Sequence, residues 1–289
     1  MQLLNDHMNN SSTEPSFFLL DCGRSAPVYV TECVDSTNDR LKKLADEGVK
    51  AGTVLIARRQ TAGRGRMSRF FESPESGLYM SILEKPETEP ERISTVTPVA
   101  AIALVKTIEK LTDLRAGEGE KGISIKWPND VQIGHRKICG ILTELHTSCD
   151  SFQKESPWQL IIGIGVNVNT KLPDFSEKVR EIAGSVSEAA GTELSLDLFA
   201  ATMIGEFDAL YQAWEENDPG VLSDYRDFCS TVGKEIYVID TVSGIGKTDE
   251  AVRKKAFALG INDDFSLHVR YEDGTCGNIN SGEVSVRVR

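Results

Sequence analysis

The chain contains one segment whose residue types suit the binding of a small anion. It reads Arg58-Arg59-Gln60-Thr61-Ala62-Gly63-Arg64-Gly65-Arg66 and follows the apolar stretch 54–57, which predicts a strand. Glycine lets the backbone approach a ligand closely. Arginine side chains match carboxylate and phosphate oxygens with two parallel hydrogen bonds. We call this segment the glycine–arginine loop (58–66) and interpret it as a candidate carboxylate or phosphate site.

An ordinary solvated loop is the alternative interpretation, because arginine and glycine are common in such loops. No GKS or GKT follows, so the segment is not a P-loop. A third glycine and a following helix are missing, which argues against a dinucleotide-binding motif. Taken alone, the loop leaves both interpretations open.

A second segment of unusual composition, Lys126-Trp127-Pro128-Asn129-Asp130, lies downstream. The proline favours an extended or turn conformation at Trp127. Lys126 would supply a cation for phosphate oxygens, and Asp130 a carboxylate for Mg²⁺. A plain turn with one packed tryptophan is the alternative.

Further polar residues have simpler explanations. The side chains in Asp35-Ser36-Thr37-Asn38 are typical of a helix N-cap. Lys137 follows a predicted turn and by itself indicates only a solvated charge. Asn167 is harder to explain, because a polar side chain at the end of an apolar strand needs a partner.

No nucleophile stands out in the sequence. It has neither a GxSxG motif nor a cysteine with an obvious histidine partner. Cationic loops without a nucleophile suit phosphoryl or nucleotidyl transfer, where positioning and electrostatics do most of the catalysis.

The helices and strands expected from the sequence, which must position these residues, indicate an α/β (α+β) fold. It consists of a mixed sheet with helices, followed by a small β module. Hydrophobic periodicity predicts strands over 53–57, 78–83, 123–126, 132–133, 137–145 and 158–168. It predicts helices over 40–47, 95–111, 176–190 and 196–216, with a short helix reaching 228. Short alternating segments then follow at 235–239, 265–271 and 284–288. We expect a tail over 1–26 containing a short strand at 17–20, a catalytic domain over 27–230 and a β domain over 231–289.

Composition limits the partners and the compartment. The net charge of −12 over 289 residues argues against duplex DNA as a partner. Six scattered cysteines and four histidines predict reduced thiols and no zinc site. The apolar segment 17–20 is too short for a signal peptide, and no apolar run reaches the roughly 20 residues that a membrane span needs, so we expect neither. We therefore expect a cytoplasmic protein without membrane association.

Six segments, taken in order along 28–289, resemble the motifs of the biotin protein ligase family. They are 35–38 (DSTN), 60–66 (QTAGRGR), 126–130 (KWPND), 136–144 (RKICGILTE), 163–169 (GIGVNVN) and 281–285 (SGEVS). The resemblance implies a class II synthetase-like catalytic domain followed by a small SH3-like β-barrel. It also implies ATP, biotin and Mg²⁺ as substrates and cofactor. Biotinyl-5′-AMP would form first, and its biotinyl group would pass to a lysine of a biotin carboxyl carrier domain, such as that of acetyl-CoA carboxylase.

The resemblance also implies roles for individual residues. Ser36, Thr37, Asn38 and Gln60 would contact biotin, while Arg64, Gly65 and Arg66 would surround the biotin carboxylate and the adenylate phosphate. Lys137 would contact the biotin carboxylate or the anhydride oxygen, and Lys126 the phosphates; with Arg66 these are the expected catalytic residues. Trp127, Asn129, Asp130 and Asn167 would form the nucleotide site, with Asp130 holding Mg²⁺ or orienting Lys126.

Two other functions share part of this pattern. A lipoate–protein ligase has the same core fold, although the glycine–arginine loop and the KWPND segment favour biotin. A non-catalytic biotin-binding regulator would tolerate loss of Lys126, Asp130 or Lys137, all of which are present. Many family members carry an N-terminal DNA-binding domain, and residues 1–26 are too few for one, so we expect a monofunctional ligase. The sequence leaves open whether it forms a homodimer. Residues 246–260 depart from the family by making the first turn of the β module longer and more charged.

Overall fold

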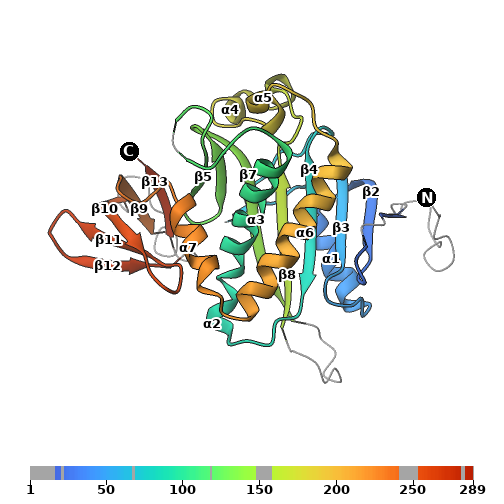
Figure 1. Ribbon diagram of the computed structural model, residues 1–289, viewed down its shortest axis with the longest axis horizontal. Coiled ribbons are helices and arrows are strands. Elements are labelled where there is room, and N and C mark those ends of the chain that lie inside the picture. Colours follow the sequence, from blue (N-terminus) through green and yellow to red (C-terminus); the bar gives the residue numbers. More distant parts are fainter. Residues whose placement is uncertain are drawn as a thin grey trace.

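The computed structural model combines a large mixed sheet, helices on both of its faces and a smaller antiparallel sheet (Figure 1). It describes residues 17–20, 23–66, 69–117, 119–147, 158–240, 253–280 and 284–288. The predicted α/β (α+β) class with a C-terminal β module is confirmed. None of the helices in these ranges combines the length and apolar character needed to cross a membrane.

The large sheet has eight strands in the order β1-β2-β3-β4-β8-β7-β6-β5. Strands β2 and β3 are parallel, and the other neighbours are antiparallel. The strands are β1 (Phe18–Leu19), β2 (Val28–Val34), β3 (Val54–Gln60), β4 (Leu78–Glu84), β5 (Ile123–Lys126), β6 (Asp130–Ile133), β7 (Arg136–His146) and β8 (Gln159–Val166). The strands predicted from the sequence, including the short one at 17–20, are therefore present. Most differ from the prediction by a few residues at their ends.

The two faces of this sheet carry different layers. Alternate residues of β8 point to opposite faces: Ile162 and Ile164 join the main core, while Ile161 joins a second cluster with Leu41 and Leu44 of α1 (Thr37–Asp46). On the main-core face, α3 (Val96–Leu111) and α6 (Leu196–Glu215) pack side by side (Figure 1), and most residues of α3 are buried. Helices α2 (Pro90–Ile93) and α7 (Pro219–Phe228) complete this part.

One predicted helix, 176–190, is wrong. The structure has a 3₁₀ turn (Leu172–Asp174) and two short helices, α4 (Glu177–Arg180) and α5 (Val186–Ala190). Between the helices the backbone pairs with the start of β7: Lys137 N donates to Ile182 O at 2.8 Å, and Gly184 N donates to Lys137 O at 3.0 Å. These tertiary hydrogen bonds replace the ones that a continuous helix would make.

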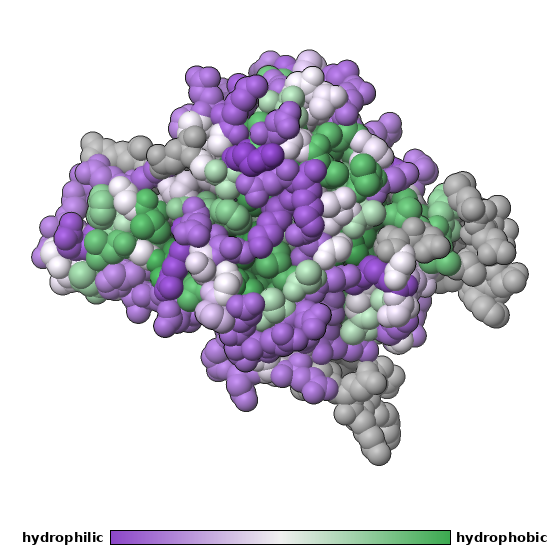
Figure 2. Space-filling view, in the orientation of Figure 1, coloured by the Kyte–Doolittle hydropathy of each residue, from purple (hydrophilic) through white to green (hydrophobic). Residues whose placement is uncertain are grey.

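The C-terminal module is a five-stranded antiparallel sheet in the order β12-β11-β10-β9-β13. The strands are β9 (Glu235–Asp240), β10 (Arg253–Ile261), β11 (Leu267–Tyr271), β12 (Cys276–Ile279) and β13 (Val284–Val288). Most of the segment interpreted as a long turn, 253–260, is strand, while 246–252 and the motif residues 281–283 lie outside the described residues. Figure 2 shows apolar side chains gathered over this module, where Phe257 and Leu259 of β10 are exposed.

Candidate ligand-binding site

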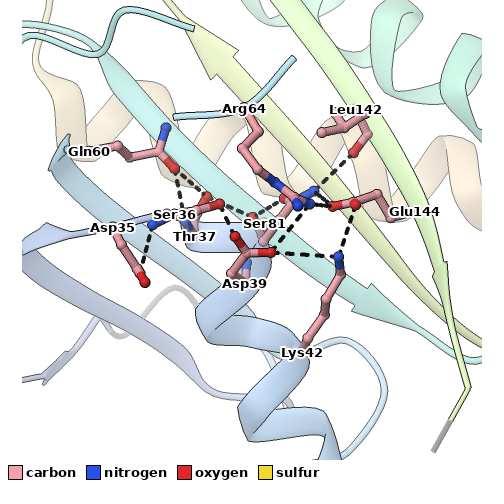
Figure 3. A network of polar contacts seen from close by, with 11 residues as sticks. Asp35, Ser36, Thr37, Asp39, Lys42, Gln60, Arg64, Ser81, Leu142 and Glu144 are labelled. Atoms are coloured by element: carbon pink, nitrogen blue, oxygen red, sulfur yellow. Dashed lines mark hydrogen bonds and ion pairs between the residues drawn. The ribbon is translucent and has the colours of Figure 1, made fainter. Parts of the chain in front are cut away.

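The N-terminus of α1 and the end of β3 form one polar wall. Ser36 is the N-cap of α1, as predicted, and its side chain accepts from Asp39 N at 3.4 Å. Gln60 is the last residue of β3, and its Oε1 accepts from Thr37 N at 2.8 Å and from Thr37 Oγ1 at 3.1 Å. Gln60, which is 23 residues from Thr37 in sequence, is thus brought beside Ser36 and Thr37 (Figure 3).

Asn38 continues this wall toward the middle of the sheet. Its Nδ2 donates to Glu144 Oε2 at 2.8 Å and to Leu142 O at 3.3 Å. Ser81 Oγ lies 2.6 Å from Asn38 Oδ1 and 2.7 Å from Thr37 Oγ1. The sequence analysis missed Ser81, although a serine in the middle of the apolar strand β4 is a detectable signal of a buried polar contact.

Three glycines of β7 and β8 form the floor. A Cβ at Gly163 would lie 2.2 Å from Asn38 Oδ1, and one at Gly165 would lie 2.7 Å from Phe71 Cε1. A Cβ at Gly140 would lie 3.1 Å from Phe71 Cε2 and 3.3 Å from Lys137 Nζ. Any larger residue would fill the space above the strands, which explains why glycine occupies these positions.

The space above the floor is a cavity of about 20 Å³. It is lined by Ser36, Thr37, Asn38, Gln60, Arg64, Phe71, Tyr79, Met80, Gly140, Leu142, Gly163, Ile164 and Gly165. The Phe71 ring packs edge-on against Tyr79, with centroids 6.4 Å apart. Such a volume holds roughly one water molecule, and the Phe71 ring lies close above Gly140 and Gly165. The sequence analysis gave Phe71 no role.

A cluster of charged and polar groups lies beside the cavity. Lys137 Nζ contacts Asp130 Oδ1 at 2.6 Å, and Arg66 Nη1 donates to Asn129 Oδ1 at 3.2 Å. Asn129 is itself buried and donates to Ile141 O at 2.7 Å. Burial lowers the pKa of the Arg66 guanidinium, while the nearby Asp130 carboxylate opposes that shift. The Asp130 carboxylate thus contacts Lys137 and interacts with the Arg66 guanidinium, so the two basic side chains flank one carboxylate.

Arg64 points to a different place from Arg66. Its guanidinium contacts the Glu144 carboxylate and lies 3.3 Å from Asp39 Oδ1 (Figure 3). Gly65 N donates to Arg69 O at 2.7 Å. The structure therefore brings Arg66 to the Lys137 cluster and Arg64 to the side of α1.

The remaining predicted residues surround these groups. Lys126 ends β5 and is paired in register with Asp130. Asn167 is buried, and its Nδ2 donates to Gly184 O at 3.0 Å beside the start of β7. Trp127 is buried elsewhere: its indole donates to Phe265 O at 3.0 Å, so its side chain packs toward the β module. The structure does not bring Trp127 to the cavity.

The potential metal ligands in the described part of the chain are scattered. This part contains no group of three or more histidine, cysteine, aspartate or glutamate side chains arranged to hold a metal ion. Burial raises the pKa of the Cys139 thiol, despite the opposing charge of Lys137, so this thiol stays neutral. The arrangement suits a ligand with a hydrogen-bonding group at one end and an anionic group at the other.

The chain is similar to several known proteins. The sequence model of the Biotin/lipoate A/B protein ligase family matches residues 30–167. The bifunctional ligase/repressor BirA of Bacillus subtilis is 37% identical over 164 residues, which are 56% of this chain and 47% of BirA. A biotin–[acetyl-CoA-carboxylase] ligase of Paracoccus denitrificans is 31% identical over 172 residues, 57% of this chain and 67% of the relative.

Among solved structures, the biotin protein ligase of Aquifex aeolicus in complex with biotin and ATP matches with a TM-score of 0.75 and 26% identity. The match covers 92% of this chain and 100% of that one. The chain spans about half the length of the BirA proteins that it matches, from 47% to 59%.

Proposed function

Because the chain belongs to the biotin/lipoate A/B protein ligase family, we propose that it joins biotin to a lysine of a biotin carboxyl carrier domain, using ATP. One observation carries the proposal: a small polar cavity on a glycine floor adjoins the Lys137–Asp130–Arg66 cluster. Biotin has a matching shape, with a ureido ring at one end and a carboxylate at the other.

The polar wall would bind the ureido group. This group has two N–H donors and one carbonyl acceptor, which need partners when they leave water. Ser36, Thr37, Asn38 and Gln60 supply both donors and acceptors around the cavity. The Phe71 ring would have to shift first, because the present cavity holds only about one water molecule.

The cationic cluster would carry out the first step. The carboxylate oxygen of biotin attacks the α-phosphorus of ATP, the bond to the β-phosphate oxygen breaks, and biotinyl-5′-AMP and pyrophosphate result. Both reactants are anions, so fixed cations must offset their repulsion. Lys137 and Arg66 would stand at the carboxylate and the α-phosphate, and Lys126 at the outgoing phosphates.

Mg²⁺ would reach the site with ATP. Magnesium usually takes one or two protein carboxylates and completes its shell with phosphate oxygens and water. Asp130 fits that role as a lone carboxylate next to the cations. When bound, the ion neutralises phosphate charge. We assign Asn129 and Asn167 to the nucleotide pocket. Trp127 would affect this pocket only indirectly, through its contact with the β module.

The second step would use a partner. The lysine amine of a carrier domain attacks the anhydride carbonyl, an amide forms and AMP leaves, so this chain needs no covalent intermediate of its own. We propose 27–230 and 231–289 as the limits of two domains and the cytoplasm, where ATP is abundant, as the compartment.

The test is incubation with ATP, Mg²⁺, biotin and an isolated carrier domain, scored by the mass of the carrier. We expect biotin-dependent ATP–pyrophosphate exchange and a carrier heavier by one biotinyl group. Lipoate in place of biotin is the matched control. Lipoyl-AMP without biotinyl-AMP would identify a lipoate ligase, and biotin binding without exchange would identify a non-catalytic regulator.

A further inference from the structure

Glu144 contacts the site from outside the cavity and has no role in the function proposed above. It lies on β7, and its Oε2 accepts from Asn38 Nδ2 and from the Arg64 guanidinium. Its Oε1 lies 2.9 Å from Lys42 Nζ (Figure 3). One carboxylate thus joins β7 to α1 and to the glycine–arginine loop.

The neighbours of the Glu144 carboxylate stabilise its charged form. Its side chain is only 23% exposed, and burial alone would raise its pKa. Hydrogen bonds from Asn38, Lys42 and Arg64 outweigh burial and lower the pKa below the ordinary value. Glu144 therefore stays ionised at neutral pH and acts only as a hydrogen-bond acceptor.

An acceptor at this position decides which way the Asn38 amide faces. An ionised carboxylate attracts the NH₂ end, and Leu142 O, a second acceptor, supports the same orientation. The Oδ1 end then faces Ser81 and the space above Gly163. A cavity that must recognise ureido N–H groups needs this carbonyl end turned toward the ligand.

The same carboxylate also holds Arg64, and the backbone around Arg64 is hydrogen-bonded to the segment that carries Phe71. The Arg64 backbone forms a β-bridge with Phe70. Phe71 N donates to Gly63 O at 2.9 Å. A movement of Arg64 would therefore also displace the Phe71 ring, which lies over the glycine floor.

We propose that Glu144 is a positioning residue of the biotin site, which orients the Asn38 amide and holds Arg64 so that the loop stays seated beside α1. This inference rests on the proposed function. In this role Arg64 attaches the glycine–arginine loop to Glu144 on β7, while Arg66 and Lys137 act on the reacting groups. Glu144 then affects the binding of biotin more than the rate of adenylate formation.

Glu144→Gln is the direct test, because glutamine keeps the shape but can present an amide NH₂ to Asn38 and carries no charge for Arg64. The Kd of biotin, measured by calorimetry without ATP, should rise about tenfold, or about 1.4 kcal/mol. The kcat of pyrophosphate exchange at saturating biotin should stay within about twofold. Trypsin should cleave after Arg64 several times faster, since the freed side chain can enter the protease.

Two matched variants separate this role from general loss of stability. Glu206→Gln removes a similarly buried carboxylate, 14% exposed, from an ion pair with Lys110 on the opposite face. Lys42→Gln removes a partner of Glu144 that does not line the cavity. Both should leave the biotin Kd and the cleavage after Arg64 within about twofold of the wild type.

The outcomes distinguish the inference from the proposed function. A wild-type chain without biotin-dependent exchange refutes the function, and the role of Glu144 with it. An active wild type with an unchanged biotin Kd in Glu144→Gln overturns the inference alone, and so does an equal loss in Glu206→Gln. If Glu144→Gln does not fold, Glu144→Asp decides, because its shorter carboxylate keeps the charge but lies too far from Asn38 and Arg64: a several-fold higher biotin Kd supports the positioning role, and an unchanged one overturns it.

Discussion

Glu84, the last residue of β4, should make the protein less stable as the pH rises. It is only 8% exposed. Burial raises the pKa of its carboxyl from 4.5 to about 8; Arg24 opposes this shift, while Asp208 and Glu215 add to it. The folded protein therefore keeps a proton on Glu84 over a pH range in which the unfolded chain has lost it.

The size of the effect follows from that range. Between pH 4.5 and about 8 the folded state binds one more proton than the unfolded state. The free energy of unfolding then falls by about 1.4 kcal/mol per pH unit. Relative to pH 4.5, the loss is about 3 kcal/mol at pH 7 and about 4 kcal/mol at pH 8, where the folded state is itself half titrated.

Glu84→Gln removes this titration and retains the shape of the side chain. Urea unfolding followed by tryptophan fluorescence at pH 5, 6, 7 and 8 would measure it. The free energy of unfolding of the variant, relative to that of the wild type, should increase at each pH step, by roughly 3 kcal/mol in all between pH 5 and pH 8. Glu193→Gln, whose side chain is 76% exposed, is the control and should show a constant difference. A constant difference for Glu84→Gln as well would refute the reasoning.

Three further substitutions test the site. Lys137→Ala should lower biotin-dependent pyrophosphate exchange by at least about 10²-fold, because a fixed cation beside the reacting carboxylate is lost; retention of most activity would show that the lysine acts elsewhere. Arg66→Gly should let biotinyl-AMP escape, so that bystander proteins become labelled; unchanged labelling would contradict this role. Gly163→Ala should raise the biotin Kd at least about tenfold, because the new Cβ would meet Asn38 Oδ1 at 2.2 Å. Gly205→Ala, on α6 with no atom within 4 Å, should instead stabilise the fold by about 0.5–1 kcal/mol in urea unfolding.

Local sequence patterns were sufficient to predict the features of the structure that have a local cause. The N-cap at Ser36 follows from side chains that satisfy neighbouring N–H groups. The length of α3 follows from its continuous apolar periodicity. The ordered motifs predicted the family, because each of them combines residue types with a spacing that chance seldom repeats.

Contacts between distant segments decided the rest. Whether Arg64 faces a ligand or Glu144 depends on how the loop packs against α1 and β7. The sequence of residues 58–66 does not specify that packing. The helix expected over 176–190 is broken because Lys137, far away in sequence, supplies backbone partners at Ile182 and Gly184. The Phe71 ring packs over the glycine floor because Gly140 of β7 and Gly165 of β8, both far away in sequence, leave room for it. Residue types therefore indicate which chemistry is available, and the energies of long-range contacts decide which side chains meet to perform it.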